Sequence, residues 1–362
     1  MSSALDPTVL ERQKAAWRYR FLANGIDPYD YDTTTARISS IDRWLDEWTK
    51  TADGHVARAD EAARQGHLVT AAHFRRLAAL CLHFGHFNAV RPLDKWLAAQ
   101  DRKAELYRMV LPFLDPPAER VEIPFEKITL PAHLRKPRGV DRPPVAIFFS
   151  GLDSTKEEAG TFENVLLARG LATLTFDGPG QGETWVKMPG RVDQEKAPMA
   201  VVDWVEKRPD LDADRVVSLG VSLGGYFAPR HACLDPRVRA CAAIGGRFSQ
   251  EDRDLKDELH AERFLHFWNV KTVPEAEPIM KASTLEGIIE KMDRPLLVVH
   301  GAKDNIAVPE NAKRMADRAP KGEWVLYEEG NHVCNNVPHI YRPFVADWLR
   351  DQVSGQESEM VG

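Results

Sequence analysis

The sequence lacks any long apolar run. Its densest stretch, residues 145–149, is five residues long, whereas roughly 18–20 apolar residues are needed to span a bilayer. The N-terminus, Met-Ser-Ser-Ala-Leu-Asp-Pro, also lacks the basic and apolar regions of a secretory signal. We therefore expect a cytoplasmic protein that has no membrane partner.

Cysteine and basic charge are also scarce. The four cysteines form no Cys-x-x-Cys pair, which excludes a disulfide scaffold and a zinc knuckle. Forty-eight basic against fifty-four acidic residues give a net charge of −6, and this argues against a nucleic-acid-binding protein, which would show a basic excess. The 43% hydrophobic content excludes a disordered chain.

The 362 residues predict two domains, and the pattern changes near residue 115. Residues 1–118 show only helical periodicity and are predicted to form a helical N-terminal domain. The helical stretches are 9–24, 38–50, 55–65, 68–87 and 92–113. Residues 119–353 are predicted to form a second domain, and the polar residues 354–362 are predicted to form a mobile tail.

Short apolar runs alternate with helical stretches in the second domain. A hairpin at 121–136 is followed by runs at 145–150, 171–176, 215–219, 238–244, 295–300 and 324–328. The helical stretches between and after them are 157–169, 194–207, 223–234, 309–318 and 338–353. This order predicts an α/β fold with a doubly wound parallel sheet. The long connection at about 249–292 predicts an inserted helical cap over a site.

The strongest motif is Gly220-Val-Ser222-Leu-Gly224, which matches G-x-S-x-G between a predicted strand and a predicted helix. The glycines permit a sharp turn that lifts a serine hydroxyl out of the sheet. Ser222 is therefore the candidate nucleophile, and the amide of Leu223 is a candidate donor to an oxyanion. An ordinary tight turn is the alternative interpretation.

A serine hydroxyl needs a base, and the expected chain order is serine, acid, histidine. Asp304 follows one predicted strand and His332 the next, so both lie where α/β sheets place their sites. We predict His332 as the base and Asp304 as the acid that orients it. The rivals are less well placed along the chain; they are Asp293, His300, Glu328, Glu329 and His339.

The second oxyanion donor is expected after the strand at 145–150, where Gly151 would let the backbone approach the substrate and Leu152 would supply the amide. A plain turn is the alternative. Five aromatic residues are candidate pocket linings, namely Trp185, Tyr226, Phe248, Phe264 and Trp268. The turn at 177–182 lacks the G-K-[ST] of a phosphate loop and is interpreted as structural. The histidines of the helical region have no metal-ligand spacing, so no metal is predicted.

Four ordered blocks carry a resemblance: residues 151–158, residues 175–183, Gly220-Val-Ser-Leu-Gly-Gly225 and Gly330-Asn-His-Val-Cys-Asn-Asn336. Together they resemble the α/β-hydrolase family that contains 2,6-dihydroxypseudooxynicotine hydrolase, fungal hydrolases that shorten polyketide chains, and esterases of the fermentation–respiration switch group. The likeness covers most of residues 119–350. It implies that a helical N-terminal domain helps to cover the site, that the protein forms a homodimer, and that no cofactor is used.

The resemblance also places nucleophile, acid and base on Ser222, Asp304 and His332. It implies a further acid after the sixth strand, for which Glu251, Asp252 and Asp254 are the candidates, none of them fixed by a motif. The leading hypothesis is hydrolysis of a carbon–carbon bond beside a ketone in a 1,3-diketone-like, acyl-aromatic or polyketide small-molecule substrate. In it Ser222 attacks the carbonyl or positions water. The alternatives are a carboxylesterase or amidase, and a non-catalytic binding protein.

Overall fold

The computed structural model describes residues 7–88 and 90–354. It divides into two compact units. One comprises the chain up to Glu119 together with Glu157–Thr161, and the other comprises Arg120–Lys156 and the chain from Phe162 onward. The grouping of Glu157–Thr161 with the helical part is not apparent in the sequence pattern. Of the predicted tail, residues 355–362 lie outside the described part of the chain.

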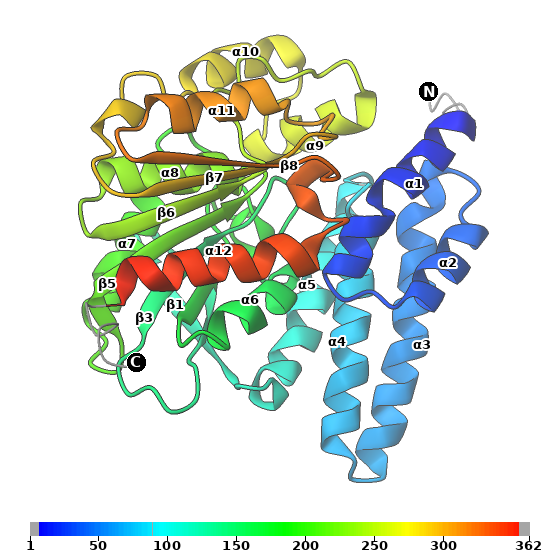
Figure 1. The fold of residues 1–362 in the computed structure, drawn as a ribbon. Helices are drawn as coiled ribbons and strands as arrows, with labels where there is room; N and C mark the ends of the chain where they lie inside the picture. The colour runs from blue at the N-terminus through cyan, green and yellow to red at the C-terminus, as the bar shows by residue number, and fades with distance from the viewer. Residues whose placement is uncertain (1–6, 89, 355–362) are drawn as a thin grey trace. The chain divides into compact units, whose positions relative to one another are not determined.

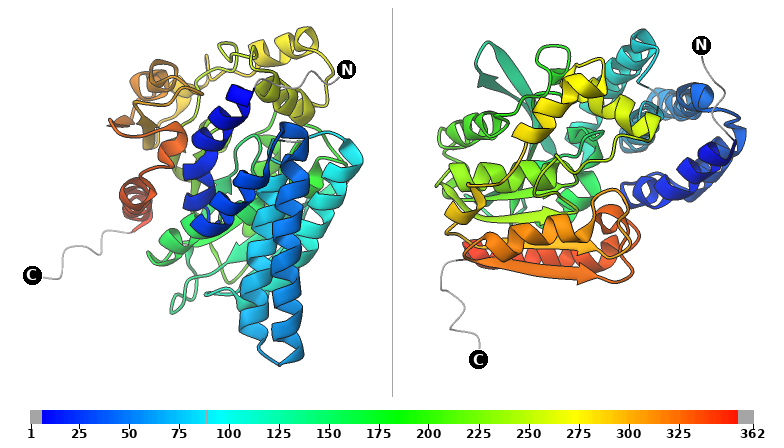
Figure 2. Two further views of the ribbon diagram at one scale, coloured as in Figure 1. Left: turned by 90° about the vertical axis from the view of Figure 1, so that its right-hand side faces the viewer. Right: turned by 90° about the horizontal axis from the view of Figure 1, so that it is seen from above.

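The first unit is helical. Its helices are α1 (Pro7–Ala23), α2 (Pro28–Arg37), α3 (Trp44–Arg64), α4 (Leu68–Gly85) and α5 (Leu93–Val110), with short 3-10 turns at Ile41–Arg43 and Leu111–Phe113. Helices α3 and α4 lie side by side along their length (Figure 2). Residues 44–50 of the first predicted stretch and the stretch predicted at 55–65 belong to the single helix α3, which continues through Gly54 without a break.

Aromatic side chains fill the interior of this unit. The rings of Phe21 and Phe84 stack with centroids 4.0 Å apart, and the Trp44 indole donates a hydrogen bond of 3.0 Å to the Phe84 carbonyl. Trp44 and Trp48 are fully buried. These residues therefore form a core that is separate from the sheet.

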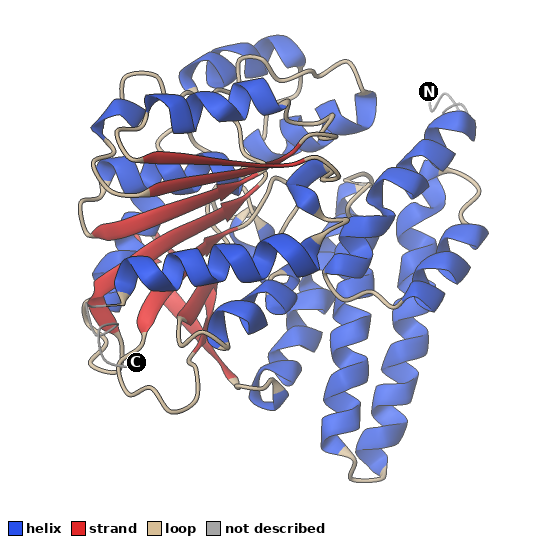
Figure 3. Cartoon of the chain, viewed as in Figure 1, coloured by secondary structure: helices blue, strands red, loops and turns tan. Residues whose placement is uncertain are grey.

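The second unit is built on one eight-stranded sheet (Figure 3). Its strands are β1 (Ala118–Phe125), β2 (Ile128–Arg135), β3 (Pro144–Phe149), β4 (Ala172–Phe176), β5 (Asp212–Val221), β6 (Val238–Ile244), β7 (Leu296–Gly301) and β8 (Gly322–Tyr327). The spatial order is β1-β2-β4-β3-β5-β6-β7-β8. Strands β3 to β8 pair in parallel and β2 pairs antiparallel with β4. The predicted doubly wound sheet is confirmed.

Helices cover both faces of the sheet, as crossover connections between parallel strands require. Figure 1 shows α6 (Gly160–Leu167) and α12 (Pro338–Val353) on one face, with α7 (Lys196–Val205) and α8 (Gly224–Leu234) on the other. Helix α11 (Pro309–Arg318) packs against β7 and β8. Strands β3, β4 and β7 are buried along their whole length.

The connection between β6 and β7 contains α9 (Glu258–Trp268), α10 (Val273–Ala282) and a 3-10 turn at Ile289–Lys291. Helix α9 begins where the Asp257 carboxylate accepts the His260 amide, and α10 begins where the Thr272 hydroxyl accepts the Glu275 amide. An inserted helical segment is therefore present where it is predicted. Among the described residues, no helix combines the length and apolar character that crossing a bilayer requires.

Candidate active site

Ser222 occupies a tight turn between β5 and α8. Its backbone is left-handed, with φ 55°, and its amide donates to the Ile244 carbonyl at 2.9 Å. The flanking glycines are required by space: a Cβ at Gly220 would lie 1.9 Å from the Gly224 carbonyl oxygen, and one at Gly224 would lie 2.1 Å from the Phe149 carbonyl oxygen. The strained turn holds the hydroxyl of Ser222 at the carboxyl end of the sheet.

Three predicted side chains form one hydrogen-bonded chain. His332 Nε2 lies 2.9 Å from Ser222 Oγ, and His332 Nδ1 lies 2.8 Å from Asp304 Oδ2. They come from the turn after β5, the loop after β7 and the loop after β8. The structure therefore joins residues that are 110 and 28 positions apart in the sequence.

The loop that carries His332 is fixed by its neighbours. The amide of Asn331 donates to Asn336 Oδ1 at 2.9 Å, and the amide of Asn336 donates back to Asn331 Oδ1 at 3.2 Å. Val333, the next residue after the histidine, has φ 58° and packs against Gly245. These contacts orient the imidazole before any substrate arrives.

Asp304 is a buried, ionised carboxylate. Its Oδ1 accepts the amides of Ile306 and Ala307, each at 2.9 Å. Burial alone would raise the pKa of Asp304, but the charge of His332 and hydrogen bonds from His300 and His332 hold it well below the usual range. His300 Nε2 lies 3.2 Å from Asp304 Oδ2 and 2.6 Å from the Ala307 carbonyl oxygen. His300, which the sequence offers as a rival base, thus makes a local contact that supports the acid.

These contacts determine which nitrogen of His332 carries the proton. An ionised carboxylate only accepts, so Nδ1 donates to Asp304. Nε2 is then free to accept the hydroxyl proton of Ser222. The arrangement can generate a serine alkoxide and stabilise the imidazolium that forms.

Two backbone amides can face an oxyanion beside this serine. The position of a Cβ at Gly151 lies 3.1 Å from Ser222 Cβ, so the loop after β3 approaches the serine closely. Within residues 7–88 and 90–354, the amides of Leu152 and Leu223 have no protein acceptor. These two amides therefore have no partner within the described residues, and their role as oxyanion donors stays a prediction.

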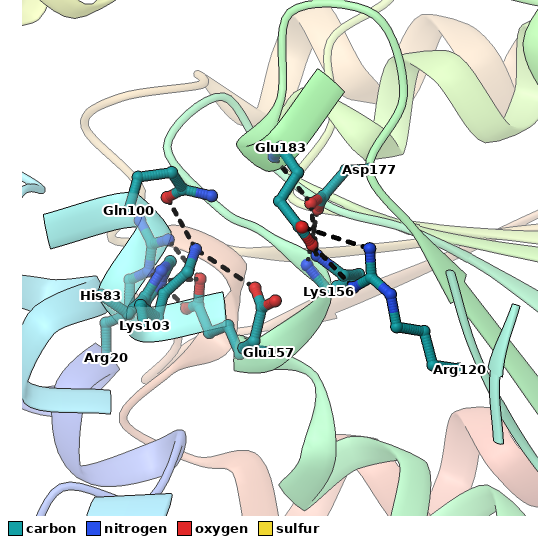
Figure 4. A network of polar contacts seen from close by, with 10 residues as sticks. Arg20, His83, Gln100, Lys103, Arg120, Lys156, Glu157, Asp177 and Glu183 are labelled. Carbon is teal, nitrogen blue, oxygen red and sulfur yellow. Dashed lines mark hydrogen bonds and ion pairs between the residues drawn. The ribbon is translucent and has the colours of Figure 1, made fainter. Parts of the chain in front are cut away.

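The turn at 177–182 holds the loop after β3 in place. Gln181 Nε2 donates to the carbonyl oxygens of Ser150 and Gly151, at 3.1 and 2.9 Å. Asp177 accepts the backbone amide of Lys156 at 3.0 Å and its ammonium group at 2.7 Å. Figure 4 shows the same ammonium directed at Glu183, 2.6 Å away. The turn therefore has a structural role, because its side chains position the candidate oxyanion loop.

The candidate extra acids do not contact the three central residues. Glu251, Asp252 and Asp254 are exposed, and in the described part of the chain no hydrogen bond or ion pair joins them to Ser222 or His332. The Asp252 carboxylate instead accepts a hydrogen bond of 2.8 Å from the side-chain Nδ2 of Asn311. The segment turns these carboxylates outward and buries Arg253 between them.

Four of the five candidate pocket aromatics are buried in the core, namely Tyr226, Phe248, Phe264 and Trp268. Trp185 is half-buried and stacks on His266 with ring centroids 4.2 Å apart. Phe264 lies under the guanidinium of Arg253, 4.9 Å from the ring centroid. Trp185 therefore contacts helix α9, and the role of the five aromatics as pocket linings stays a prediction.

A second Ser-His-Asp combination lies inside the sheet layer. Ser218 Oγ is 3.0 Å from His231 Nδ1, and His231 Nε2 is 3.4 Å from Asp235. All three residues are buried, and burial lowers the pKa of His231. Because a substrate has no access to a fully buried serine, this combination is structural.

Histidines of the first unit have structural partners. His83 Nε2 lies 2.9 Å from the buried Glu158, which also pairs with Arg20 at 2.8 Å. His55 lies 2.7 Å from Asp30. The structural interpretation of these two histidines agrees with these contacts.

Family models and known proteins resemble this chain. A model described as esterase FrsA-like matches residues 8–251, and one described as the prolyl oligopeptidase family matches residues 163–354. 2,6-Dihydropseudooxynicotine hydrolase of Paenarthrobacter nicotinovorans is 33% identical over 335 residues, which cover 92% of this chain and 90% of that protein. Hydrolase acrC of Aspergillus aculeatus is 36% identical over 231 residues, and the match spans about half of that protein, 52%.

Solved structures resemble it as well. The crystal structure of 2,6-dihydroxy-pseudo-oxynicotine hydrolase superposes with a TM-score of 0.84 at 32% identity, over 92% of this chain and 95% of that one. AbyA5 superposes with a TM-score of 0.73 at 18% identity, over 96% of this chain and 100% of that one, which shows a shared fold.

Proposed function

This chain belongs to the FrsA-like esterase family of α/β-hydrolases, and from that premise we propose that it hydrolyses a carbon–carbon bond beside a ketone by means of Ser222, His332 and Asp304. The observation that supports this proposal most strongly is the hydrogen-bonded chain from Ser222 Oγ through His332 to Asp304, at 2.9 and 2.8 Å. The chain is a hydrolase, and the identity of the bond it cleaves is the proposal.

The choice of bond rests on the relatives. The relative that aligns along 92% of this chain is named for a pseudooxynicotine, and the four ordered blocks resemble hydrolases that cleave beside a ketone. A carboxylesterase would use the same serine, histidine and aspartate but would not need to protonate carbon. The substrate class that we favour is therefore a small 1,3-diketone or acyl-aromatic ketone.

The reaction begins when the Ser222 oxygen adds to the ketone carbonyl and His332 Nε2 takes the hydroxyl proton. The amides of Leu223 and Leu152 hold the oxyanion, and such donors are worth about 10²–10³ in kcat each. When the carbonyl re-forms, the carbon–carbon bond breaks and its electron pair leaves as an enolate. The acyl group stays on Ser222 until water, activated by His332, releases it as a carboxylic acid.

The enolate must receive a proton on carbon. After the first step His332 carries that proton as an imidazolium, and its Nε2 lies 2.9 Å from the Ser222 oxygen to which the substrate is attached. The exposed carboxylates of Glu251, Asp252 and Asp254 have no contact with this site. We therefore assign carbon protonation to His332, a general acid step worth about 10²–10⁴ in rate.

A substrate panel tests the proposal. Wild-type enzyme and Ser222→Ala are incubated with aryl 1,3-diketones and with acyl esters of matched size, and the products are identified by mass spectrometry. We expect wild type to convert diketones into one carboxylic acid and one ketone, and Ser222→Ala to be inactive. Efficient ester turnover with no diketone cleavage would contradict the carbon–carbon assignment and establish the carboxylesterase alternative.

A further inference from the structure

Three buried arginines gather where the cap segment begins. Arg247 and Arg253 lie in the loop after β6, and Arg263 lies on α9; their exposed fractions are 6%, 8% and 5%. Arginine is rarely buried to this extent unless it is paired. The groups that contact these side chains therefore indicate which kind of ligand the loop could bind.

Arg253 is fixed by neutral groups alone. Its Nε and Nη2 donate to Gln250 Oε1 at 3.0 and 2.8 Å, and its Nη1 donates to His260 Nε2 at 2.9 Å. Its guanidinium also lies over the ring of Phe264. These contacts orient the guanidinium without neutralising its charge.

Arg247 is also without a counter-ion. Its Nη2 donates to the Ile306 carbonyl, and its buried Nε has no hydrogen-bond partner. Throughout the described ranges, no carboxylate oxygen lies within 4.0 Å of Arg247 or Arg253. An uncompensated buried charge is costly, because its desolvation is not offset.

This cluster borders the candidate active site. Arg247 follows Ile244 by three residues, and the Ile244 carbonyl accepts the amide of Ser222. The carboxylate charges of Asp304, Asp252 and Asp254 act on the Arg247 guanidinium, although none of them lies within ion-pair distance in the described residues. Arg263 Nε lies 3.4 Å from Asp153, the residue after the oxyanion candidate Leu152.

The buried arginines of this cluster repel one another. Burial lowers the pKa of Arg253 to about 9; the charges of Arg247 and Arg263 act in the same direction, and the charge of Asp153 opposes them. Burial and the neighbouring arginines likewise lower the pKa of His260 to about 2, so His260 is neutral at physiological pH. A bound anion would relieve the repulsion among these groups.

We propose that Arg253 and Arg247 bind a carboxylate of the substrate, so that the natural substrate is an anionic keto acid rather than a neutral ketone. A carboxylate suits them because the planar guanidinium presents paired donors that match its two oxygens. The assignment of the cleaved bond rests on the proposed function, whereas the carboxylate site rests on the arginines.

A matched substrate pair tests the site. One member is an aryl 1,3-diketone bearing a carboxylate, and the other is its primary amide, which has nearly the same shape but no charge. We expect wild type to prefer the acid by about 100-fold in kcat/KM, as charge-assisted hydrogen bonds allow. Arg253→Met and Arg247→Met should each reduce that preference at least tenfold, and Arg253→Lys should keep part of it.

The control is Arg239→Met, at the opposite end of β6, where the exposed arginine donates to the Asp214 carbonyl. It should leave the preference unchanged. If Arg253→Met lost the same factor in kcat/KM on the acid substrate and on the amide substrate, the proposal would be overturned. Such a result would show that the arginine stabilises the enolate or the fold. Equal kcat/KM of the wild-type enzyme on the acid substrate and the amide substrate would also overturn it.

A binding measurement separates this proposal from the proposed function. Calorimetry of Ser222→Ala with an uncleavable aryl keto acid measures carboxylate binding whatever bond the enzyme cleaves. We expect binding that weakens at least tenfold in Ser222→Ala/Arg253→Met. If the keto acid binds in this way but wild type cleaves no diketone, only the assignment of the bond is refuted. If the keto acid does not bind, the carboxylate site is refuted.

Discussion

Replacing Asp304 with asparagine removes the negative charge behind His332 and little else. Asp304 Oδ1 is held by two amides at 2.9 Å, so the asparagine oxygen keeps that place and its amino group faces His332 Nδ1. That group donates, and Nδ1 must then accept, so the proton moves to Nε2. His332 can no longer accept the hydroxyl proton of Ser222.

The magnitude follows from the geometry. Opposite charges about 4 Å apart attract by about 4 kcal/mol at an effective dielectric constant near 20. In serine hydrolases the aspartate-to-asparagine exchange lowers kcat about 10⁴-fold, which corresponds to ~5 kcal/mol of activation free energy. We therefore expect Asp304→Asn to lose 10³–10⁴ in kcat with a small change in KM, by the order-of-magnitude reasoning above.

Steady-state kinetics on the best substrate of the panel measure this loss. Urea unfolding of the same preparations establishes that the variant is folded. A folded Asp304→Asn enzyme whose kcat falls less than tenfold would refute the assignment of Asp304 as the acid that orients His332.

Three further outcomes are expected. Gln181→Leu should lower kcat about tenfold, less than the loss of a direct oxyanion donor, because the loop at Gly151 loses its support; an unchanged kcat would show that this hydrogen bond is dispensable. Asp254→Asn should change kcat/KM less than threefold, as is usual for a surface substitution, and a large loss would identify it as a catalytic acid. The pKa of His260, lowered to about 2 by burial and nearby arginines, lies below its unfolded value near 6.5. The unfolded chain therefore binds a proton that the folded chain does not, so stability falls as pH drops below about 6.5. His260→Gln, which keeps an acceptor for Arg253, should reduce the fall in unfolding free energy between pH 7 and 5 by ~2 kcal/mol; an identical fall in wild type and variant would contradict this.

The predictable parts of the structure are those that depend on local sequence. Strands that are buried on both faces appear as continuous apolar runs, and residues that follow their carboxyl ends converge at one edge. Ser222, Asp304 and His332 follow such strands and could be named from position alone. The structure brings them together at hydrogen-bonding distances of 2.9 and 2.8 Å.

Helix α2 escaped prediction because it carries no apolar periodicity. Three consecutive threonines, Thr33–Thr35, are weak helix formers, and the helix depends on the Asp27 cap, on Pro28 at its start and on burial of Tyr31. Such a helix is specified by packing more than by its own pattern.

The supporting residues of the site depend on tertiary contacts. Gln181 acts through carbonyl groups 31 and 30 residues away in the sequence, and Arg253 is buried although it stands in a run of charged residues. No spacing rule identifies such partners. The cytoplasmic location and the homodimer stay predictions.

Labelling with a fluorophosphonate, followed by peptide mapping, tests the central claim most directly. We expect one adduct per chain, on the peptide that contains Ser222, with no adduct in Ser222→Ala and much slower labelling in His332→Ala. No adduct on folded wild-type protein, or an adduct on another residue, would contradict the assignment of Ser222 as the nucleophile.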